Sequence, residues 1–416
     1  MPILTLNTGS SSIKFALYEI PHVVADERLV LAGSLERIGL PNSRFHVADA
    51  SRATLVDEAC ELPESAAAID VLLRWLASDR SLPPVEAVGH RIVHGGPRHM
   101  RPERITPALL AALRALTPLA PAHLPGELAA IAAVSAAYPQ VPQVACFDTA
   151  FHRSRPRVAQ VYGLPWRFTE QGVLRYGFHG LSYEYILQEL ARETGTEVAH
   201  GRLVVAHLGN GSSMAAILRG KSMDATMGFT PLGGMVMSTR TGDLDPGVLL
   251  YLLEERRLTP AELRTLVGDQ SGLLGISGIS SDMRDLLARQ SDDPRAALAV
   301  ELYCYTARKY LGALAAVLGG LDTLIFTAGI GEHAAPIRTR ICSELGFLGI
   351  QLDAERNAAD AAIISATGAA VTVRVLPTNE ELMIARHTAA VLRDAQGAPP
   401  PTNPDECIGG AELPPR

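Results

Sequence analysis

The sequence is poor in the features that mark several classes of protein. It has five cysteines among 416 residues, and no two of them show CxxC or metal-ligand spacing. An odd number of scattered thiols fits a reduced cytosolic protein better than a disulfide framework or a structural zinc site. No basic and apolar leader opens the chain, and its longest apolar run, near 310–321, is too short to span a bilayer. We therefore expect a cytoplasmic protein without a membrane partner.

Clustered positive charge is also missing. The net charge is −7 and no stretch is rich in Lys or Arg, which argues against a nucleic-acid partner. A few local arginines can still bind a small anion inside an acidic protein. Hydrophobic residues make up 47% and charged residues 19%, as in globular proteins, and the length suits two domains.

One supersecondary unit occurs twice, about 200 residues apart. Each copy is a predicted β-hairpin whose tip is rich in Gly, Ser and Asn. The first copy has strands at 3–6 and 13–18 around the tip at 7–12, and the second has strands at 203–208 and 214–218 around the tip at 209–213. Gly9-Ser10-Ser11 aligns with Gly211-Ser212-Ser213 without gaps. A recurrence at this spacing predicts a duplicated domain rather than a solenoid.

The rest of the chain alternates between helical and strand patterns. This alternation predicts an α/β fold with covered sheets. Helices are expected at 106–115, 126–138, 182–194 and 297–318, and buried strands at 144–147, 324–327 and 371–375. The last stretch, 396–416, is rich in Pro and Gly and is predicted to be a disordered tail.

Three glycine-containing segments could hold phosphate. A tight turn of Gly and Ser offers backbone N–H groups and hydroxyls to phosphate oxygens, although a single turn of this kind is more often only a turn. Two matching copies favour phosphate binding, and Lys14 follows the first. The third segment, 326–333, runs from a hydrophobic strand into Gly-x-Gly-Glu, at the strand end where α/β proteins bind ligands. It matches neither the dinucleotide fingerprint nor the Lys-bearing loop of the common NTPases.

Polar residues that could act in catalysis gather near predicted strand ends and in glycine-flanked loops. Each histidine among them could equally be a buried structural side chain. The two arginines are harder to explain structurally, because the guanidinium fork suits carboxylate and phosphate groups. The candidates are Arg91, His94, His123, Asp148, His152, His179, Arg240 and Asp243.

The order and spacing of eight motifs resemble the acetate kinase family, which includes propionate kinases, over residues 4 to about 391. These motifs are LNTGSSSIKF at 6–15, GHRIVHGG at 89–96, FDTAFH at 147–152, RYGFHG at 175–180, HLGNGSS at 207–213, MDATMGFTPL at 223–232, RTGDLDPG at 240–247 and PTNEEL at 377–382. The family belongs to the actin-like ATPases and sugar kinases.

The resemblance implies two duplicated actin-like ATPase domains of the ribonuclease H-like type with a central nucleotide cleft. On this basis we expect an N-terminal domain at 1–149, a nucleotide-binding domain at 150–385, and a helix end at 386–395 that returns to the first domain. Members of the family are usually homodimers, so a homodimer is expected here.

The resemblance also implies roles for individual residues. Asn7 and Glu380 hold Mg²⁺, for which Mn²⁺ could substitute. Catalytic roles fall to Arg91, His123, Asp148, His179 and Arg240. The small pocket for the acid is lined by Arg91, Val93, Ala122, Phe178 and Pro231. Nucleotide or phosphate contacts fall to Ser10, Ser12, Lys14, His207, Leu208, Gly209, Asn210, Gly211, Asp282, Met283, Arg284, Gly329, Ile330, Gly331, Glu332 and His333.

The activity implied is reversible Mg²⁺-dependent transfer of the γ-phosphoryl group of ATP to acetate, giving acetyl phosphate and ADP. Alternatives are a propionate or mixed short-chain carboxylate kinase and, from another class, a non-catalytic ATP-binding protein on the same fold. The chain has Ala-His-Leu-Pro at 122–125 where the family usually has Leu-His-Asn-Pro, and Leu-Ser-Tyr at 181–183 where it usually has Thr-Ser-His. The first departure leaves open whether the preferred acid is acetate or propionate.

Overall fold

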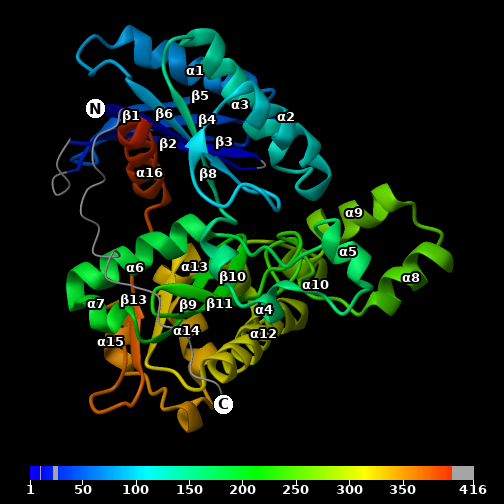
Figure 1. Ribbon diagram of the computed structural model, residues 1–416. Helices are drawn as coiled ribbons and strands as arrows, with labels where there is room; N and C mark the ends of the chain where they lie inside the picture. The colour runs from blue at the N-terminus through cyan, green and yellow to red at the C-terminus, as the bar shows by residue number, and fades with distance from the viewer. Residues whose placement is uncertain (10, 22–26, 396–416) are drawn as a thin grey trace. The chain divides into compact units, whose positions relative to one another are not determined.

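The computed structural model describes residues 1–9, 11–21 and 27–395, and the chain packs into two compact units (Figure 1). Among the described residues, unit 1 comprises 1–92, 101–147 and 380–395, and unit 2 comprises 93–100 and 148–379. These units are defined by packing, and the domain boundaries expected from the sequence at 149 and 385 remain a prediction. The tail predicted at 396–416 and the phosphate contact predicted for Ser10 lie outside the described residues.

Unit 1 is built on a sheet in which, within the described residues, eight strands take the order β5-β4-β3-β2-β1-β6-β8-β7. Its strands are β1 (Pro2–Thr8), β2 (Ser12–Glu19), β3 (Arg28–Glu36), β4 (Arg44–Asp49), β5 (Thr54–Ala59), β6 (Ala87–Ile92), β7 (Glu103–Arg104) and β8 (Gln143–Phe147). Its helices are α1 (Ser65–Ser78), α2 (Pro107–Ala115), α3 (Leu124–Ala137) and α16 (Glu380–Ala395).

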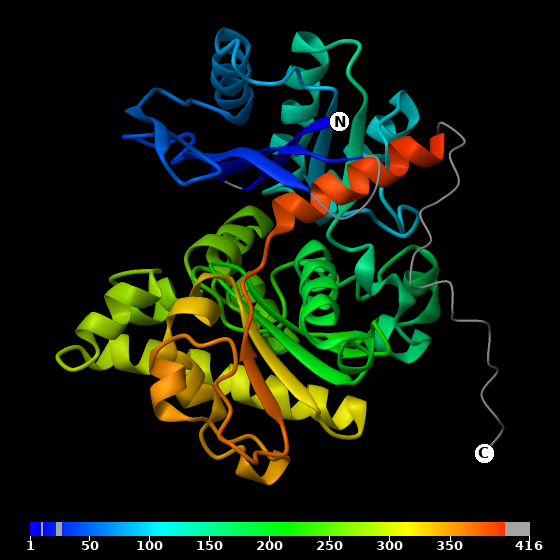
Figure 2. The same ribbon diagram turned by 90° about the vertical axis from the view of Figure 1, so that its left-hand side faces the viewer.

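Helices cover both faces of the central strands of this sheet. Neighbouring residues of a strand point to opposite faces. Val88 of β6 accordingly packs in the apolar core that includes residues of α1 and α3, whereas Gly89 faces Ile384 and Thr388 of α16. A β-carbon at Gly89 would lie 2.6 Å from Cγ2 of Ile384, so glycine permits α16 to approach this closely (Figure 2).

Unit 2 repeats the central part of this topology. Its sheet has the order β11-β10-β9-β12-β13, formed by β9 (Arg202–Leu208), β10 (Ser212–Leu218), β11 (Lys221–Ala225), β12 (Thr323–Thr327) and β13 (Thr372–Val375). In both sheets the first strand of the hairpin pairs antiparallel with the second and parallel with a later strand, β6 or β12. The shared strand order confirms the predicted α/β fold and its duplication.

The two hairpins differ at the tip. The first ladder ends at Thr8↔Ile13 and the second at Leu208↔Ser212. The first turn is therefore one residue longer, and Gly9 corresponds in position to Gly209. The gap-free match with Gly211 was wrong in register, because one inserted residue in a turn is invisible when both turns are rich in Gly and Ser.

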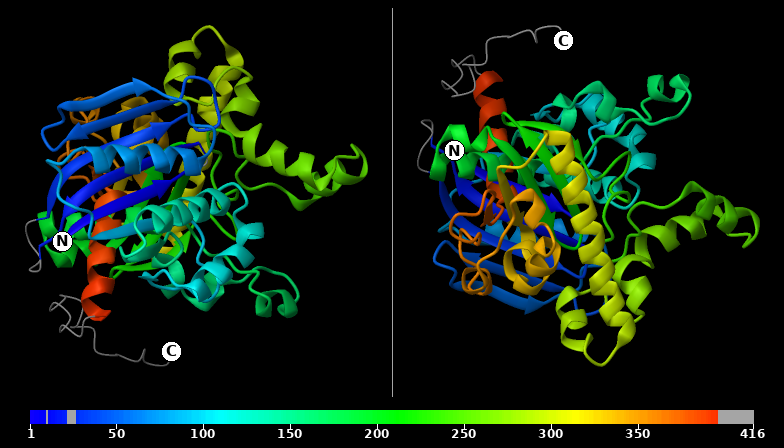
Figure 3. Two further views of the ribbon diagram at one scale, coloured as in Figure 1. Left: turned by 90° about the horizontal axis from the view of Figure 1, so that it is seen from above. Right: turned by 90° about the horizontal axis from the view of Figure 1, so that it is seen from below.

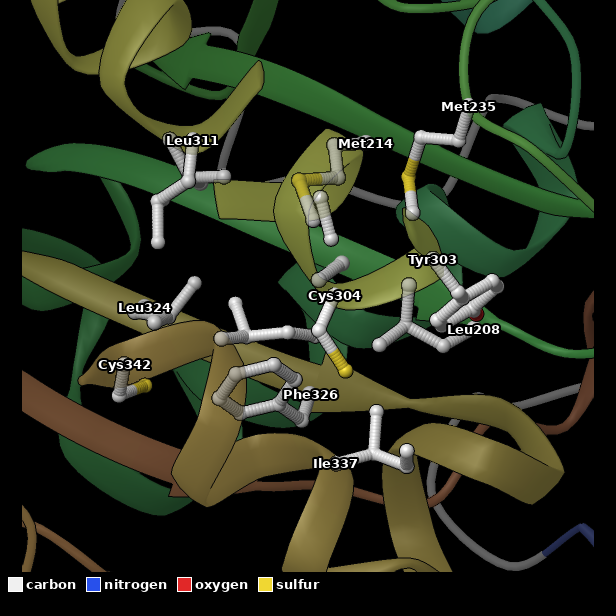
Figure 4. Packing of buried hydrophobic residues seen from close by; sticks show 14 of the residues in the cluster. Leu208, Met214, Met235, Tyr303, Cys304, Leu311, Leu324, Phe326, Ile337 and Cys342 are labelled. Carbon is white, nitrogen blue, oxygen red and sulfur yellow. The ribbon is translucent and has the colours of Figure 1, made fainter. Parts of the chain in front are cut away.

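Two helices cover opposite faces of the second sheet. Val204, Ala206 and Leu208 of β9 join a core with α12 (Pro294–Leu318), and Leu203 and Val205 join a core with α6 (Gly180–Thr194). Figure 3 shows α12 crossing this sheet, and Figure 4 shows the core beneath it, including Leu208, Met214 and Phe326. Each Val, Leu, Met or Phe side chain among them contributes roughly 1.5–3 kcal/mol by burial, so these faces hold the strand ends in place.

The remaining helices of unit 2 are short. They are α4 (Arg157–Gln160), α5 (Trp166–Glu170), α7 (Thr196–Ala199), α8 (Pro246–Glu254), α9 (Pro260–Asp269), α10 (Gly272–Ser277), α11 (Met283–Arg289), α13 (Ala328–His333), α14 (Ala335–Cys342) and α15 (Ala354–Ala358). The helices and strands expected from the sequence all occur at these positions. Among the helices in the described parts of the chain, none has the length and apolar character that a bilayer span requires.

Candidate active site

In unit 1, three segments far apart in sequence bring polar side chains to the end of β1. Asn7 lies near this strand end and is 7% exposed. Its amide nitrogen donates to Oε2 of Glu380 at 2.9 Å and to Oε1 of Glu381 at 3.1 Å. Its amide oxygen accepts from Nη1 of Arg91 at 2.9 Å. The parallel pairing of β1 with β6, and the start of α16 beside them, explain why these residues meet.

The two carboxylates beside Asn7 fit a hard divalent cation. Carboxylate and amide oxygens are the ligands that Mg²⁺ prefers, and Mg²⁺ usually takes only one or two carboxylates, completing its shell with water and phosphate. Glu380 and Glu381 supply two carboxylates next to the Asn7 amide. No cluster of three or more His, Cys, Asp or Glu side chains suited to a metal occurs in the described residues. Sequence reasoning missed Glu381, although it lies in the same Asn-Glu-Glu motif.

The other candidates of unit 1 lie on the hairpin and at the start of α3. Ser12 closes the first hairpin turn, since its carbonyl accepts the N–H of Gly9 at 2.7 Å. Lys14 lies opposite Asn7 in the ladder, and its side chain is exposed. His123 occupies the N-cap position of α3 without a side-chain capping hydrogen bond and is half-buried, beside an exposed Ala122.

In unit 2, a constrained loop places His179 at the N-terminus of α6. This residue has φ 58°, in the left-handed region that non-glycine residues rarely adopt. The next residue, Gly180, donates its N–H to the carbonyl of the buried Asp148 at 2.9 Å. A β-carbon at Gly180 would lie 2.2 Å from that carbonyl oxygen, so only glycine fits. Strain of this kind persists where the surroundings hold it, and it gathers at functional sites.

The side chains of His179 and Arg240 converge on the second hairpin turn. A β-carbon at Gly211 would lie 3.4 Å from Nε2 of His179 and 3.5 Å from Nη1 of Arg240. The space that glycine leaves open is therefore bordered by a guanidinium and an imidazole nitrogen. Nη1 of Arg240 also donates to the carbonyl of Pro231 at 3.2 Å, which orients the guanidinium. A permanent cation beside exposed turn N–H groups favours an anion in this space.

A second histidine stacks on the first. The rings of His179 and His207 have centroids 4.1 Å apart and planes 19° from parallel. Each ring is held through Nδ1 by a serine hydroxyl at 2.8 Å, that of Ser213 for His179 and that of Ser182 for His207. Ser182 in turn bonds the hydroxyl of Thr378 at 2.8 Å. Sequence reasoning missed both serines and Thr378, although Ser213 lies in the repeated turn motif.

Three of the predicted acid-pocket residues, Val93, Phe178 and Pro231, belong to unit 2. Val93 and Phe178 are 2% and 1% exposed, and Pro231 is buried. His94, next to Val93, lies 5.5 Å from the Phe178 ring between centroids, and its Nε2 bonds the carbonyl of Phe229 at 3.3 Å. Burial lowers the pKa of His94 to about 4, so this ring is neutral at pH 7. Three buried side chains of this kind could contact a short alkyl group, and the pocket itself remains a prediction.

The residues predicted to contact the nucleotide lie in three segments: the end of β9 with the turn after it, the start of α11, and α13. Leu208 is a buried residue at the end of β9, and Gly209 and Asn210 form the turn after it. Asp282 caps α11 by accepting the N–H of Arg284 at 2.8 Å, and it pairs with the exposed Arg284 side chain, which lowers the pKa of the Asp282 carboxyl. Met283, between them, is buried.

The third glycine segment forms a short helix. Gly329, Ile330, Gly331, Glu332 and His333 all belong to α13, which follows β12 directly and packs against β9. Oε1 of Glu332 accepts the N–H of Ala328 at 2.7 Å and that of Thr378 at 3.3 Å. The Glu332 carboxylate therefore holds the backbone at Ala328 and Thr378 in place. A direct nucleotide contact by this side chain remains a prediction.

Comparison with known proteins gives one consistent result. The model of the Acetokinase family matches residues 2–386. A relative named acetate kinase from Rhodopseudomonas palustris is 50% identical over 390 residues, covering 92% of this chain and 97% of its own. Among solved structures, Porphyromonas gingivalis acetate kinase is 38% identical with a TM-score of 0.82, covering 94% of this chain and 99% of its own. A propionate kinase from Francisella tularensis is 35% identical with a TM-score of 0.86, and the match covers 93% of this chain and 98% of that protein.

Proposed function

The chain belongs to the acetokinase family, and from that premise we propose that it transfers the γ-phosphoryl group of ATP to acetate, giving acetyl phosphate and ADP. Members of this family are phosphotransferases that use ATP, a carboxyl acceptor and typically a divalent metal. The observation that supports the proposal most directly is the convergence of His179 and Arg240 at Gly211. A guanidinium and an imidazole nitrogen beside a Gly-rich turn are groups that could contact a transferring phosphoryl group.

In the proposed reaction, an acetate oxygen attacks the γ-phosphorus, the bond to the bridging oxygen breaks, and ADP leaves with that electron pair. The protein itself forms no covalent bond in this reaction. Its contribution to catalysis is mainly to position the reactants and to stabilise the charge of the transition state. Arg240 and Nε2 of His179 would contact the equatorial oxygens of the phosphoryl group, and Arg91 would hold the acid. His123 would stabilise transferred charge.

A general base is unnecessary for this acceptor. Carboxylic acids of this kind titrate near ~4, so acetate is already ionised at pH 7. A sugar hydroxyl, in contrast, must lose a proton during transfer. We therefore assign Asp148 an orienting or metal-linked role. Its complete burial supports a positional function.

We further propose that the metal is Mg²⁺, with Mn²⁺ able to substitute, held by Asn7 and Glu380 directly or through water. When bound, the ion would neutralise charge on the phosphate oxygens. The contacts of Asn7 with two carboxylates support this assignment. A cytoplasmic homodimer remains a prediction, which light scattering and fractionation can check.

A specific observation keeps propionate as a second candidate acid. Ala122 is smaller than the Leu usual at this position in the family and is exposed. One assay tests both acids: ATP-dependent acyl phosphate formation, trapped with hydroxylamine, across formate, acetate, propionate and butyrate. We expect the highest kcat/KM for acetate or propionate. Absence of hydroxamate with every acid, while the protein binds ATP, would instead favour a non-catalytic ATP-binding protein.

A further inference from the structure

His152 is a candidate from the sequence that has no part in the reaction proposed above. It lies on the short 3₁₀ helix η2 (Phe151–Ser154) and is 1% exposed. Its two ring nitrogens contact different elements of unit 2. Nδ1 lies 2.8 Å from Oγ of Ser222 on β11, and Nε2 lies 2.9 Å from the carbonyl oxygen of Phe178, the residue before His179.

The partners of this ring fix where its proton lies. A backbone carbonyl only accepts hydrogen bonds, so Nε2 of His152 donates to Phe178. Burial lowers the pKa of His152 to about 3, with a smaller contribution from the charge of Arg155. The ring is therefore neutral at pH 7 and carries one proton. Nδ1 carries none and accepts the hydroxyl proton of Ser222.

The ring of His152 has little room to move. A β-carbon at Gly177 would lie 2.6 Å from Cγ of His152, so the ring lies directly against the backbone at that glycine. The rings of Phe151 and Tyr183 lie edge-on to it, with centroids 5.3 and 5.5 Å away. The donor at Nε2 is therefore held in one place beside the loop at 177–179.

The carbonyl of Phe178 belongs to the peptide group that leads into His179. A peptide group is planar, so the direction of this C=O is coupled to ψ of Phe178 and φ of His179. φ of His179 is 58°, and φ of Gly177 is 77°. Glycine adopts such values readily, whereas a residue with a side chain does so only where its surroundings hold it. The bond from His152 holds the peptide group in the orientation that accompanies this φ.

The same segment of the chain also holds the peptide group that follows His179. The N–H of Gly180 donates to the carbonyl of Asp148 at 2.9 Å. The motif FDTAFH at 147–152 thus bonds the backbone both before and after the strained residue. Nε2 of that residue borders the space left open at Gly211, so the backbone conformation determines where its donor points.

We propose that His152 is a positioning residue for the reaction, which holds the peptide group between Phe178 and His179 so that the imidazole of His179 points towards the transferring phosphoryl group. This inference rests on the function proposed above and adds a residue to it. The role of His152 is indirect, because its nitrogens bond Ser222 and the backbone of Phe178.

Two amide side chains of different length separate the two contacts of the ring. The amide of glutamine reaches about as far as Nε2 of histidine, and that of asparagine about as far as Nδ1. His152→Asn therefore keeps a partner for Ser222 and removes the donor to Phe178, whereas His152→Gln can still donate to Phe178. We expect His152→Asn to lower kcat about 10-fold, the order expected when one buried acceptor loses its donor. His152→Gln should recover most of this loss, and equal losses in the two variants would overturn the proposal.

The kinetic split and a matched control exclude a general packing defect. KM for ATP should stay within about two-fold in His152→Asn, because the affected contact is made mainly in the transition state. Ser222→Ala is the control, since Ser222 is fully buried and bonds the other nitrogen of the same ring. It should leave kcat unchanged. A loss of activity in Ser222→Ala as large as that in His152→Asn would contradict the positioning role.

A double-mutant cycle tests whether the effect passes through His179. In His179→Ala the imidazole is absent, so its placement no longer matters. His152→Asn should then lower kcat little further, since residues that act as a unit are not additive. Additive losses in the double variant would show that His152 acts by another route.

Nitrogen NMR of the histidine-labelled wild type needs neither substrate nor a folded Asn variant. The signals of His152, assigned from their loss in His152→Gln, should show the Nε2–H form. An Nδ1–H form would leave Nε2 without a proton to donate to Phe178 and would overturn the proposal.

A crystal structure of His152→Asn gives a direct readout of the backbone. We expect the Phe178 carbonyl to rotate and φ of His179 to leave the left-handed region. A variant in which His179 keeps its conformation would refute the positioning role. A wild type that forms no hydroxamate with any acid would instead refute the proposed function, while a changed backbone in His152→Asn would still show that His152 holds the loop.

Discussion

The imidazole rings of His179 and His207 stack with their centroids 4.1 Å apart. One ring comes from the N-terminus of α6 and the other from β9, and both are at most 8% exposed. Two cations at this separation would repel each other strongly away from water. The stack therefore disfavours a state in which both rings are charged, and Arg240 is left as the permanent cation beside Gly211.

We accordingly predict that Arg240→Ala lowers kcat at least ~10²-fold, the scale for losing one donor to transition-state charge. Arg240→Lys should fall between this variant and the wild type, because it keeps the charge and loses the planar fork. Hydroxamate formation at saturating substrates measures the effect. The control is Arg192→Ala on α6, which removes a surface ion pair with Glu189. Activity of Arg240→Ala within a few-fold of wild type would refute the assigned role.

The sequence was sufficient to predict the architecture. The hairpins and the alternation of helices and strands follow from local periodicity, which depends on residues close in sequence. The duplication follows from the recurrence of the hairpin motif. The register of the repeat could not be obtained in this way, because the turn around Gly9 is one residue longer than that around Gly209.

The site was predictable in part. Arg240, His179 and Gly211 were identified from their motifs, and the structure brings them together. The serine partners of the two histidines could not be derived, since a serine on a strand shows no periodicity that reveals its orientation or its distant partner. Ser213 contacts His179 across 34 residues of sequence, and Ser182 contacts Thr378 across 196.

A second prediction concerns the metal. Glu380→Gln removes one carboxylate charge next to Asn7 and keeps the side-chain shape. We expect the Mg²⁺ concentration for half-maximal activity to rise about 10-fold or more, as for other changes close to a bound ion. The comparison variant is Glu36→Gln, which changes an exposed carboxylate on β3. Equal metal dependence in the two variants would exclude Glu380 from the metal site.

A third prediction concerns stability and pH. His90 is buried in β6, with Nε2 bonded to Oε1 of Gln143 at 2.8 Å, and burial lowers its pKa to about 4. In the unfolded chain it titrates near 6.5, so between these values the unfolded state binds more protons. The neutral form in the fold therefore contributes stability that is fully present above pH 6.5 and is lost as the pH falls towards 4.

The test is the difference in unfolding free energy between the wild type and His90→Gln, whose amide can still donate to Gln143. The pKa shift of His90 predicts that, as the pH falls from 7 to 4.5, the wild type loses about 2–3 kcal/mol of unfolding free energy relative to the variant. Urea denaturation at several pH values measures it. Parallel stability curves for the two proteins would contradict the assignment.

The fourth prediction concerns the choice of acid. Ala122 lacks three carbons of the Leu that is usual at this position in the family, and each buried methylene contributes about 0.8 kcal/mol. Extra space at this position should admit the longer chain of propionate. A second candidate to fill that space is Leu124, which stands where the family usually has Asn. Its side chain is fully buried at the start of α3, whereas Ala122 is exposed, so the two side chains face different surroundings.

We therefore expect Ala122→Leu to lower the ratio of kcat/KM for propionate to that for acetate by about 10-fold or more, the usual effect of one methylene in a pocket. Butyrate should be affected in the same direction, and KM for ATP should not change, because the substitution adds only apolar volume. Leu124→Met is the matched control, since it conserves volume at the buried position. If Ala122→Leu leaves the ratio unchanged, Ala122 does not set chain length, and the acid must be selected by the apolar group of Val93, Phe178 and Pro231.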